Sequence, residues 1–177
     1  EPLGSLDRTL REGLMGELRA ILKGVGVTAL YVTHDQEEAF AVADRVLIMP
    51  CGCRAQEGTP EAVYRRPASE FVARFLGLNN LLPGRVTAVT PALEVATAVC
   101  TLALDPAEAS GAGIGDEVTI VVRPEAARLA PFPEAVKGIN LLRGTLVARS
   151  FRGSSHRLRT RHEGDVDLVF ELAAATG

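Results

Sequence analysis

Residues 27–39 read VTALYVTHDQEEA, an apolar run that ends in polar residues. The nearly continuous apolar stretch at 27–32 predicts a buried strand of a parallel sheet. His34 follows this strand, at the edge where open parallel sheets bind their ligands. A neutral imidazole there could donate a hydrogen bond to a phosphate oxygen; the alternative is a histidine that only caps its neighbour. Thr33 or Asp35 can cap the short helix expected at 36–43.

A helix and a second strand are expected on either side of this stretch. Asp7 can cap a helix whose apolar residues recur at spacings of three and four, and which ends at Gly24 and Gly26. Residues 45–49 form another apolar run that predicts a strand. The order helix, strand, helix, strand indicates an α/β fold, which two further capped helices extend to about residue 78.

From Leu82 onward the sequence changes to short runs rich in Val and Leu, separated by Gly, Pro and Asp. Runs of this kind are typical of strands, and their spacing predicts a small all-β barrel. The expected strands lie at residues 85–89, 93–104, 117–122, 144–151, 155–162 and 166–172. Residues 105–116 are rich in Ala and Gly and are expected to form a long loop. We place the boundary between the two domains near residues 78–82.

Composition excludes several classes of function. The 177 residues are 47% hydrophobic, which allows one large core or two small ones. A formal charge of −3 provides no overall field that would attract nucleic acid or an anionic membrane. No apolar run approaches the roughly 20 residues that span a bilayer, and we expect a soluble, cytoplasmic chain without a signal peptide.

The three cysteines are an odd number and do not indicate a disulfide framework. Cys51 and Cys53 flank Gly52 in an expected turn, which is conceivable as half of a metal site. No second pair and no nearby histidine would complete four-coordinate zinc. We therefore expect reduced thiols and no metal site.

Seven segments together resemble one family of proteins. The segment EPLGSLD at residues 1–7 precedes THDQEEA at 33–39, in the order found in the ATP-binding subunits of ABC importers. Further similar segments are GTPE at 58–61, FVARFLG at 71–77, NLLPGRV at 80–86, GDEV at 115–118 and VRPE at 122–125. The resemblance is to importers of the ferric-iron, polyamine and sugar type. It implies an α/β fragment at 1–78, the rear part of a P-loop ATPase domain, followed by an all-β OB-like barrel, the TOBE domain, at 79–177.

The resemblance assigns roles to three residues. Glu1 occupies the place of the carboxylate that orients the water attacking the γ-phosphate, a task that suits a hydrogen-bond acceptor. His34 matches the switch histidine that donates to the γ-phosphate. Asp7 matches the acid of the D-loop, at the interface of the dimer that closes around ATP. We expect the three residues after Asp35 to cap their helix, with no catalytic role.

Other parts of the family pattern are absent from this sequence. It contains no G-x-x-x-x-G-K-[ST] loop to hold the phosphates and Mg²⁺, and no LSGGQ-type signature. The chain also begins without Met, at Glu1 inside a motif, so we expect it to be part of a longer protein. ATP and Mg²⁺ are therefore expected cofactors of the intact protein, and none is expected for this part alone.

The resemblance also implies partners. These are a second copy bound through the C-terminal domain, transmembrane permease subunits and, through them, a solute-binding protein. The assembled transporter would place the chain at the inner face of the cell membrane. Residues 80–86 favour ferric iron as the transported solute and polyamine next, by analogy within one fold family.

A basic stripe supports an alternative function. Arg157, Arg159 and Arg161 alternate along an expected strand, so their guanidinium groups would share one face, near Arg152 and His156. The face could bind an oxyanion, an acidic regulator or a partner subunit, or could simply be solvated. The alternative hypothesis is thus a stand-alone OB-like module that binds an oxyanion or small effector. Few aromatic residues are available to stack on bases, so nucleic-acid binding is not expected.

The missing phosphate loop generates the first prediction. The purified chain, mixed with ATP and Mg²⁺, should release no phosphate above background, because phosphoryl transfer depends on the positioning and charge stabilisation that this loop provides. A phosphate-release assay measures this directly. Turnover that copurifies with the chain through successive columns would contradict the prediction.

Overall fold

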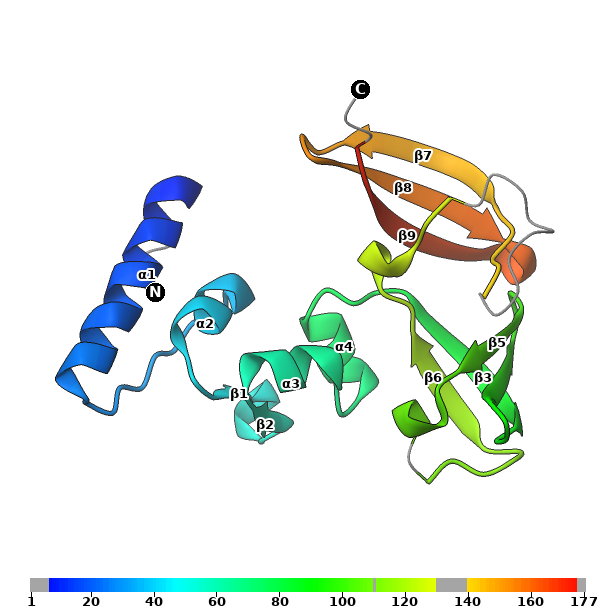
Figure 1. The fold of residues 1–177 in the computed structure, drawn as a ribbon, viewed down its shortest axis with the longest axis horizontal. Helices are drawn as coiled ribbons and strands as arrows, with labels where there is room; N and C mark the ends of the chain where they lie inside the picture. Colours follow the sequence, from blue (N-terminus) through cyan, green and yellow to red (C-terminus); the bar gives the residue numbers. More distant parts are fainter. Residues whose placement is uncertain (1–6, 110, 130–139, 175–177) are drawn as a thin grey trace. The chain divides into compact units, whose positions relative to one another are not determined.

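The computed structural model describes residues 7–109, 111–129 and 140–174 (Figure 1). The chain forms two compact units, Glu1–Leu76 and Gly77–Gly177. The first contains helices and one small hairpin, and the second contains strands and single turns of 3-10 helix. The protein is thus a mixed α and β chain, and each unit is described by itself.

Four capped helices and one hairpin make up the described part of the first unit. Each helix begins at a polar side chain that accepts a backbone N–H of the first turn: Asp7, Asp35, Thr59 and Ser69. Gly26 ends the first helix in the left-handed conformation, with φ of 70°. The elements are α1 (Arg8–Val25), α2 (Gln36–Val42), β1 (Val46–Ile48), β2 (Gln56–Gly58), α3 (Pro60–Arg65) and α4 (Glu70–Phe75), with a 3-10 turn at Pro50–Gly52.

The strand expected at residues 27–32 is wrong for this structure. This segment has no regular secondary structure between α1 and α2, and Leu30 and Val32 are 92% and 76% exposed. An extended segment becomes a strand only when neighbouring strands take up its backbone N–H and C=O groups. In the described part of this unit the one sheet is the antiparallel β1–β2 hairpin, which does not include residues 27–32. The apolar run therefore stays exposed.

The core of the first unit draws side chains from the four helices and from β1. Met15, Val42, Ile48, Val63 and Val72 are all buried. We expected the apolar residues of the last helix to pack against a sheet, and Leu76 is indeed buried. Phe71 and Phe75 are not: each is 47% exposed, and their rings stack on each other with centroids 6.3 Å apart.

The second unit is all β, as the sequence predicts. Every expected strand is present, and residues 93–104 divide into two strands at a turn in which Thr97 Oγ1 accepts the N–H groups of Val99 and Cys100. The strands are β3 (Leu81–Ala88), β4 (Leu93–Thr97), β5 (Thr101–Leu104), β6 (Glu117–Val121), β7 (Thr145–Phe151), β8 (Ser155–His162) and β9 (Val166–Ala173). The 3-10 turns lie at Pro106–Ala109, Pro124–Ala126 and Glu163–Asp165.

These strands form two antiparallel sheets, ordered β5-β4-β3-β6 and β7-β8-β9. The described strands share a core without closing into one continuous hydrogen-bonded barrel. Leu82 and Leu102 from the first sheet pack in one buried cluster with Leu168 and Phe170 from the second. A second cluster of Val86, Leu93 and Val95 lies within the four-stranded sheet.

Asn80 joins the two sheets through hydrogen bonds. Its amide nitrogen donates to the carbonyl of Val169 at 2.7 Å, and its amide oxygen accepts the N–H of Val169 at 2.8 Å. The side chain therefore pairs with β9 as a neighbouring strand would. Its own backbone carbonyl accepts the N–H of Val122. Asn80 is 3% exposed, so water does not compete for these groups.

Gly84 allows β3 to approach β4 closely. A Cβ atom at this position would lie 2.6 Å from Cγ1 of Val95 and 2.8 Å from the carbonyl oxygen of Ala96. The second contact is with backbone, which cannot rotate away. The close backbone contact therefore explains the glycine at position 84, and the hydrogen bonds to Val169 explain the asparagine at position 80. Leu82 and Val86 of the same segment are buried core residues.

The buried amide generates the second prediction. Asn80→Ala should destabilise the second unit by about 2–3 kcal/mol, because it leaves the N–H and C=O of Val169 buried without partners. Urea unfolding followed by circular dichroism measures this loss. Asn79→Ala is the matched control, since Asn79 is the exposed neighbour and should change stability by less than about 0.5 kcal/mol. Equal stabilities of the two variants would contradict the role of the amide.

Candidate functional site

His34 lies at a bend between the exposed segment 27–32 and helix α2. Its side chain is exposed, and the residues on both sides of it are half-buried. The bend places the imidazole just before the N-terminus of α2. We expected His34 at the carboxyl end of a buried strand, and that strand is not formed; the bend before α2 is what places the residue.

Hydrogen bonds fix the backbone on each side of His34. Asp35 Oδ1 accepts the N–H of Glu37 at 2.8 Å and that of Glu38 at 3.3 Å, so Asp35 is the helix cap. Thr33 Oγ1 accepts the N–H of Asp35 at 3.0 Å. Of the two caps considered for this helix, Asp35 takes that role, and the hydroxyl of Thr33 stabilises the turn before it.

Glu38 is a functional candidate that the sequence reasoning missed. It was expected only to favour the helix N-terminus, yet it is 5% exposed. Its Oε2 accepts hydrogen bonds from the hydroxyls of Tyr31 at 2.9 Å and Thr33 at 2.8 Å. Burial and the Glu38 carboxylate raise the pKa of Tyr31. The signal in the sequence was the spacing of two between the hydroxyl residues, which puts both on one side of an extended segment.

Arg11 connects this cluster to helix α1. Its Nη1 lies 3.5 Å from Asp35 Oδ2, and its Nε lies 3.9 Å from Glu38 Oε1. Its backbone N–H donates to the carbonyl of Asp7, the cap of α1. Asp7 therefore lies one helical turn before Arg11, whose side chain contacts Asp35 and Glu38. Glu1, the third expected residue of the site, lies outside the described residues.

The described residues do not by themselves form a nucleotide site. His34 can donate one hydrogen bond to a phosphate oxygen, and α2 is too short for its N-terminus to make a site by itself. No group of three or more potential metal ligands occurs in the part of the chain that the structure describes. Within the same part, no helix is both long and apolar enough to cross a bilayer.

The three arginines of the basic stripe lie on one exposed face of β8, as expected. Arg161 is held by two acids, with Nε 2.8 Å from Asp167 Oδ1 and Nη1 3.2 Å from Asp165 Oδ1. The hydrogen bond from Arg161 lowers the pKa of Asp167. Arg157 and Arg159 make no ion pair with any described carboxylate. They lie opposite Ser150 and Ala148 of β7 on one side and opposite Glu171 and Val169 of β9 on the other.

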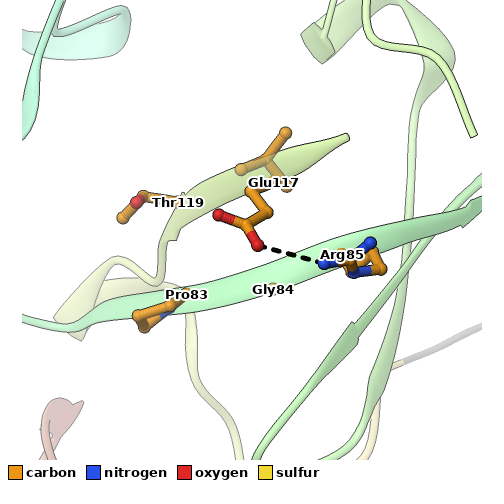
Figure 2. A pocket seen from close by; sticks show the side chains of 6 residues that line it. Pro83, Gly84, Arg85, Glu117 and Thr119 are labelled. Carbon is orange, nitrogen blue, oxygen red and sulfur yellow. Dashed lines mark hydrogen bonds and ion pairs between the residues drawn. The ribbon is translucent and has the colours of Figure 1, made fainter. Parts of the chain in front are cut away.

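Two further polar features are an ion pair in a surface hollow and a set of three thiols. Figure 2 shows a shallow hollow over β3 and β6, where Arg85 reaches to Glu117 at 3.0 Å. Since the two charges neutralise each other, the hollow offers little to a charged ligand. The three cysteines are free thiols, with Cys51 and Cys53 exposed, and burial raises the pKa of the Cys100 thiol.

Comparison with known proteins shows which proteins this chain resembles in sequence. Residues 120–177 match the TOBE domain family. The chain is 48% identical over 175 residues, or 99% of its length, to the Fe(3+) ions import ATP-binding protein of Streptomyces avermitilis. The chain is a homologue of ABC-importer ATP-binding subunits and carries a TOBE domain.

Other relatives of the same class differ in their stated solute. A spermidine/putrescine import ATP-binding protein of Thermobifida fusca is 38% identical over 96% of this chain. A sulfate/thiosulfate import ATP-binding protein of Chromobacterium violaceum is 40% identical over 96%. The chain spans about half the length of these relatives, from 44% to 46% of each. The TOBE match begins inside β6, whereas we expected the domain to begin at residue 79.

Proposed function

We propose that this chain is the rear part of the ATP-hydrolysing subunit of an ABC importer, with residues 1–78 from the ATPase domain and residues 79–177 as the TOBE domain. The observation that supports this most strongly is the alignment of 99% of the chain with an ATP-binding import protein at 48% identity. The hydrogen-bonded bend at His34 agrees with it. The division into two compact units near residue 76 is also consistent with these domains.

In this proposal three residues serve the hydrolysis step. Glu1 orients the attacking water, His34 donates a hydrogen bond to the γ-phosphate, and Asp7 lies at the dimer interface around ATP. The groups that hold the rest of ATP would come from residues outside this sequence, which has no phosphate loop. Mg²⁺ would supply charge neutralisation between the β- and γ-phosphates. Alone, these 177 residues would be inactive.

The proposed partners follow from the same assignment. The TOBE domain would contact a second copy, and the ATPase part would bind permease subunits at the inner face of the membrane, opposite a solute-binding protein. Ferric iron is the favoured solute and polyamine the next, since relatives from Streptomyces avermitilis and Streptomyces coelicolor, at 48% and 42% identity, are Fe(3+) import proteins.

The decisive experiment adds the part of a relative that this chain does not cover. Residues 1–177 are joined to the part of the Streptomyces avermitilis relative that they do not cover, and ATP turnover is measured with Mg²⁺. The joined protein should hydrolyse ATP. His34→Ala should lower kcat by about 100-fold or more, as expected for removal of one donor to developing charge.

The matched control is His156→Ala, on β8 of the other unit, where His156 contacts Arg149. That variant should keep turnover within about twofold, since it lies outside the proposed ATP site. An inactive joined protein, or equal activity of the two histidine variants, would contradict the proposed function.

A second candidate function rests on Arg157 and Arg159, which share an exposed face without an ion pair among the described residues. Here the TOBE unit would bind an oxyanion or small effector through these two guanidinium groups. Sulfate is the probe, titrated at constant ionic strength and followed by NMR at the Arg Nε–H signals. Saturable shifts at these two residues, lost in Arg157→Ala, would favour this candidate. Shifts that scale with ionic strength alone, or that appear equally at Arg85, would exclude it.

A further inference from the structure

Glu38 combines deep burial with a negative charge. It is one of three buried polar or charged residues in the described part of the chain, together with Asn80 and His162. A carboxylate away from water is unfavourable unless hydrogen-bond donors and a cation compensate it. Its partners therefore show what it holds in place.

Two of those partners come from the segment that leads to His34. The hydroxyls of Tyr31 and Thr33 both donate to Oε2 of Glu38. Because the Thr33 hydroxyl gives its only proton to Glu38, its lone pairs face the backbone, where Oγ1 accepts the N–H of Asp35. One carboxylate thus fixes the residue before His34 and, through that hydroxyl, the residue after it.

The third partner comes from another element. Arg11 of α1 lies within ion-pair distance of both Glu38 and Asp35. It stands one turn after Asp7, and its N–H closes the first turn of the helix on the Asp7 carbonyl. Figure 1 shows α1 and α2 as neighbours in the first unit. An α-helical turn is rigid, so displacement of Asp7 would move Arg11 with it.

We propose that Glu38 and Arg11 are positioning residues: Glu38 holds the bend that presents His34, and Arg11 connects this bend to the helix that begins at Asp7. This inference rests on the proposed function, which assigns His34 to the γ-phosphate and Asp7 to the dimer interface. It adds a physical connection between the two. Closure at Asp7 would act on the His34 bend through one guanidinium and two carboxylates, without any contact between Asp7 and His34.

The first test is hydrogen exchange by NMR on the 177-residue chain. In Glu38→Ala the Asp35 amide should exchange about tenfold faster or more, because the Thr33 hydroxyl is no longer oriented toward it. In Glu38→Gln the amide oxygen can accept both hydroxyls, so protection of Asp35 should return to within about threefold of the unchanged chain. Rescue by Gln separates positioning by hydrogen bonds from the need for charge.

Two controls make this test specific. Glu37→Ala removes the same charge from the exposed neighbour and should leave Asp35 exchange within about threefold. The Gly26 amide, bonded to the Leu22 carbonyl at the far end of α1, reports on a helix end away from Glu38 and should not change. Unchanged Asp35 exchange in Glu38→Ala, or equal acceleration at Gly26 without rescue by Gln, would overturn the proposal.

The second test uses the joined protein described above. Glu38→Ala and Arg11→Met should each lower kcat by about tenfold with KM for ATP changed by less than about threefold, since positioning affects the reacting geometry more than nucleotide affinity. Glu38→Gln should recover most of the loss in kcat, and Glu37→Ala should lose none. A raised KM with unchanged kcat would overturn the positioning role. An inactive unsubstituted protein would instead overturn the proposed function, while the exchange result would still decide whether Glu38 holds the bend.

Discussion

Extended backbone must find hydrogen-bond partners before it can be buried, and this constraint decides which segments of the chain become strands. In the second unit each strand has a neighbour, and where β9 meets the other sheet the amide of Asn80 takes the place of one. In the first unit residues 27–32 are as apolar as any of those strands. They have no neighbouring strand among the described residues, and they remain exposed.

The sequence predicts most elements correctly because their signals are local. Caps at Asp7, Asp35, Thr59 and Ser69 and the alternating runs beyond Leu82 depend on residues a few positions apart, and all are confirmed. The errors concern contacts between elements, which local sequence signals do not reveal. A strand at 27–32 would need neighbouring strands, and the exposure of Phe71 and Phe75 depends on which elements pack against α4. The hydrogen-bonded role of Glu38 became visible only when α2 was folded beside residues 31–33.

The same distinction applies to the candidate site. The alternation of three arginines along β8 predicted that they share a face, since this follows from one strand. The expected place of His34 at the end of a buried strand did not hold, since a strand needs neighbours. The pairing of Arg161 with Asp165 and Asp167 depends on the register of β8 and β9, which the sequence does not show. The link from Asp7 through Arg11 to the His34 bend required the packing of two helices. Contacts between elements are therefore what the structure adds to the description of the candidate site.

The central proposal is that residues 1–78 belong to an ATPase domain, in which the backbone of segment 27–32, exposed in this structure, would gain hydrogen-bond partners. Hydrogen exchange of the amides at 28–32 tests it most directly, measured in the 177-residue chain and in the chain joined to the remaining part of its Streptomyces relative. We expect exchange close to the unprotected rate in the first and at least about 100-fold slower exchange in the second. Equal exchange in both proteins would contradict it.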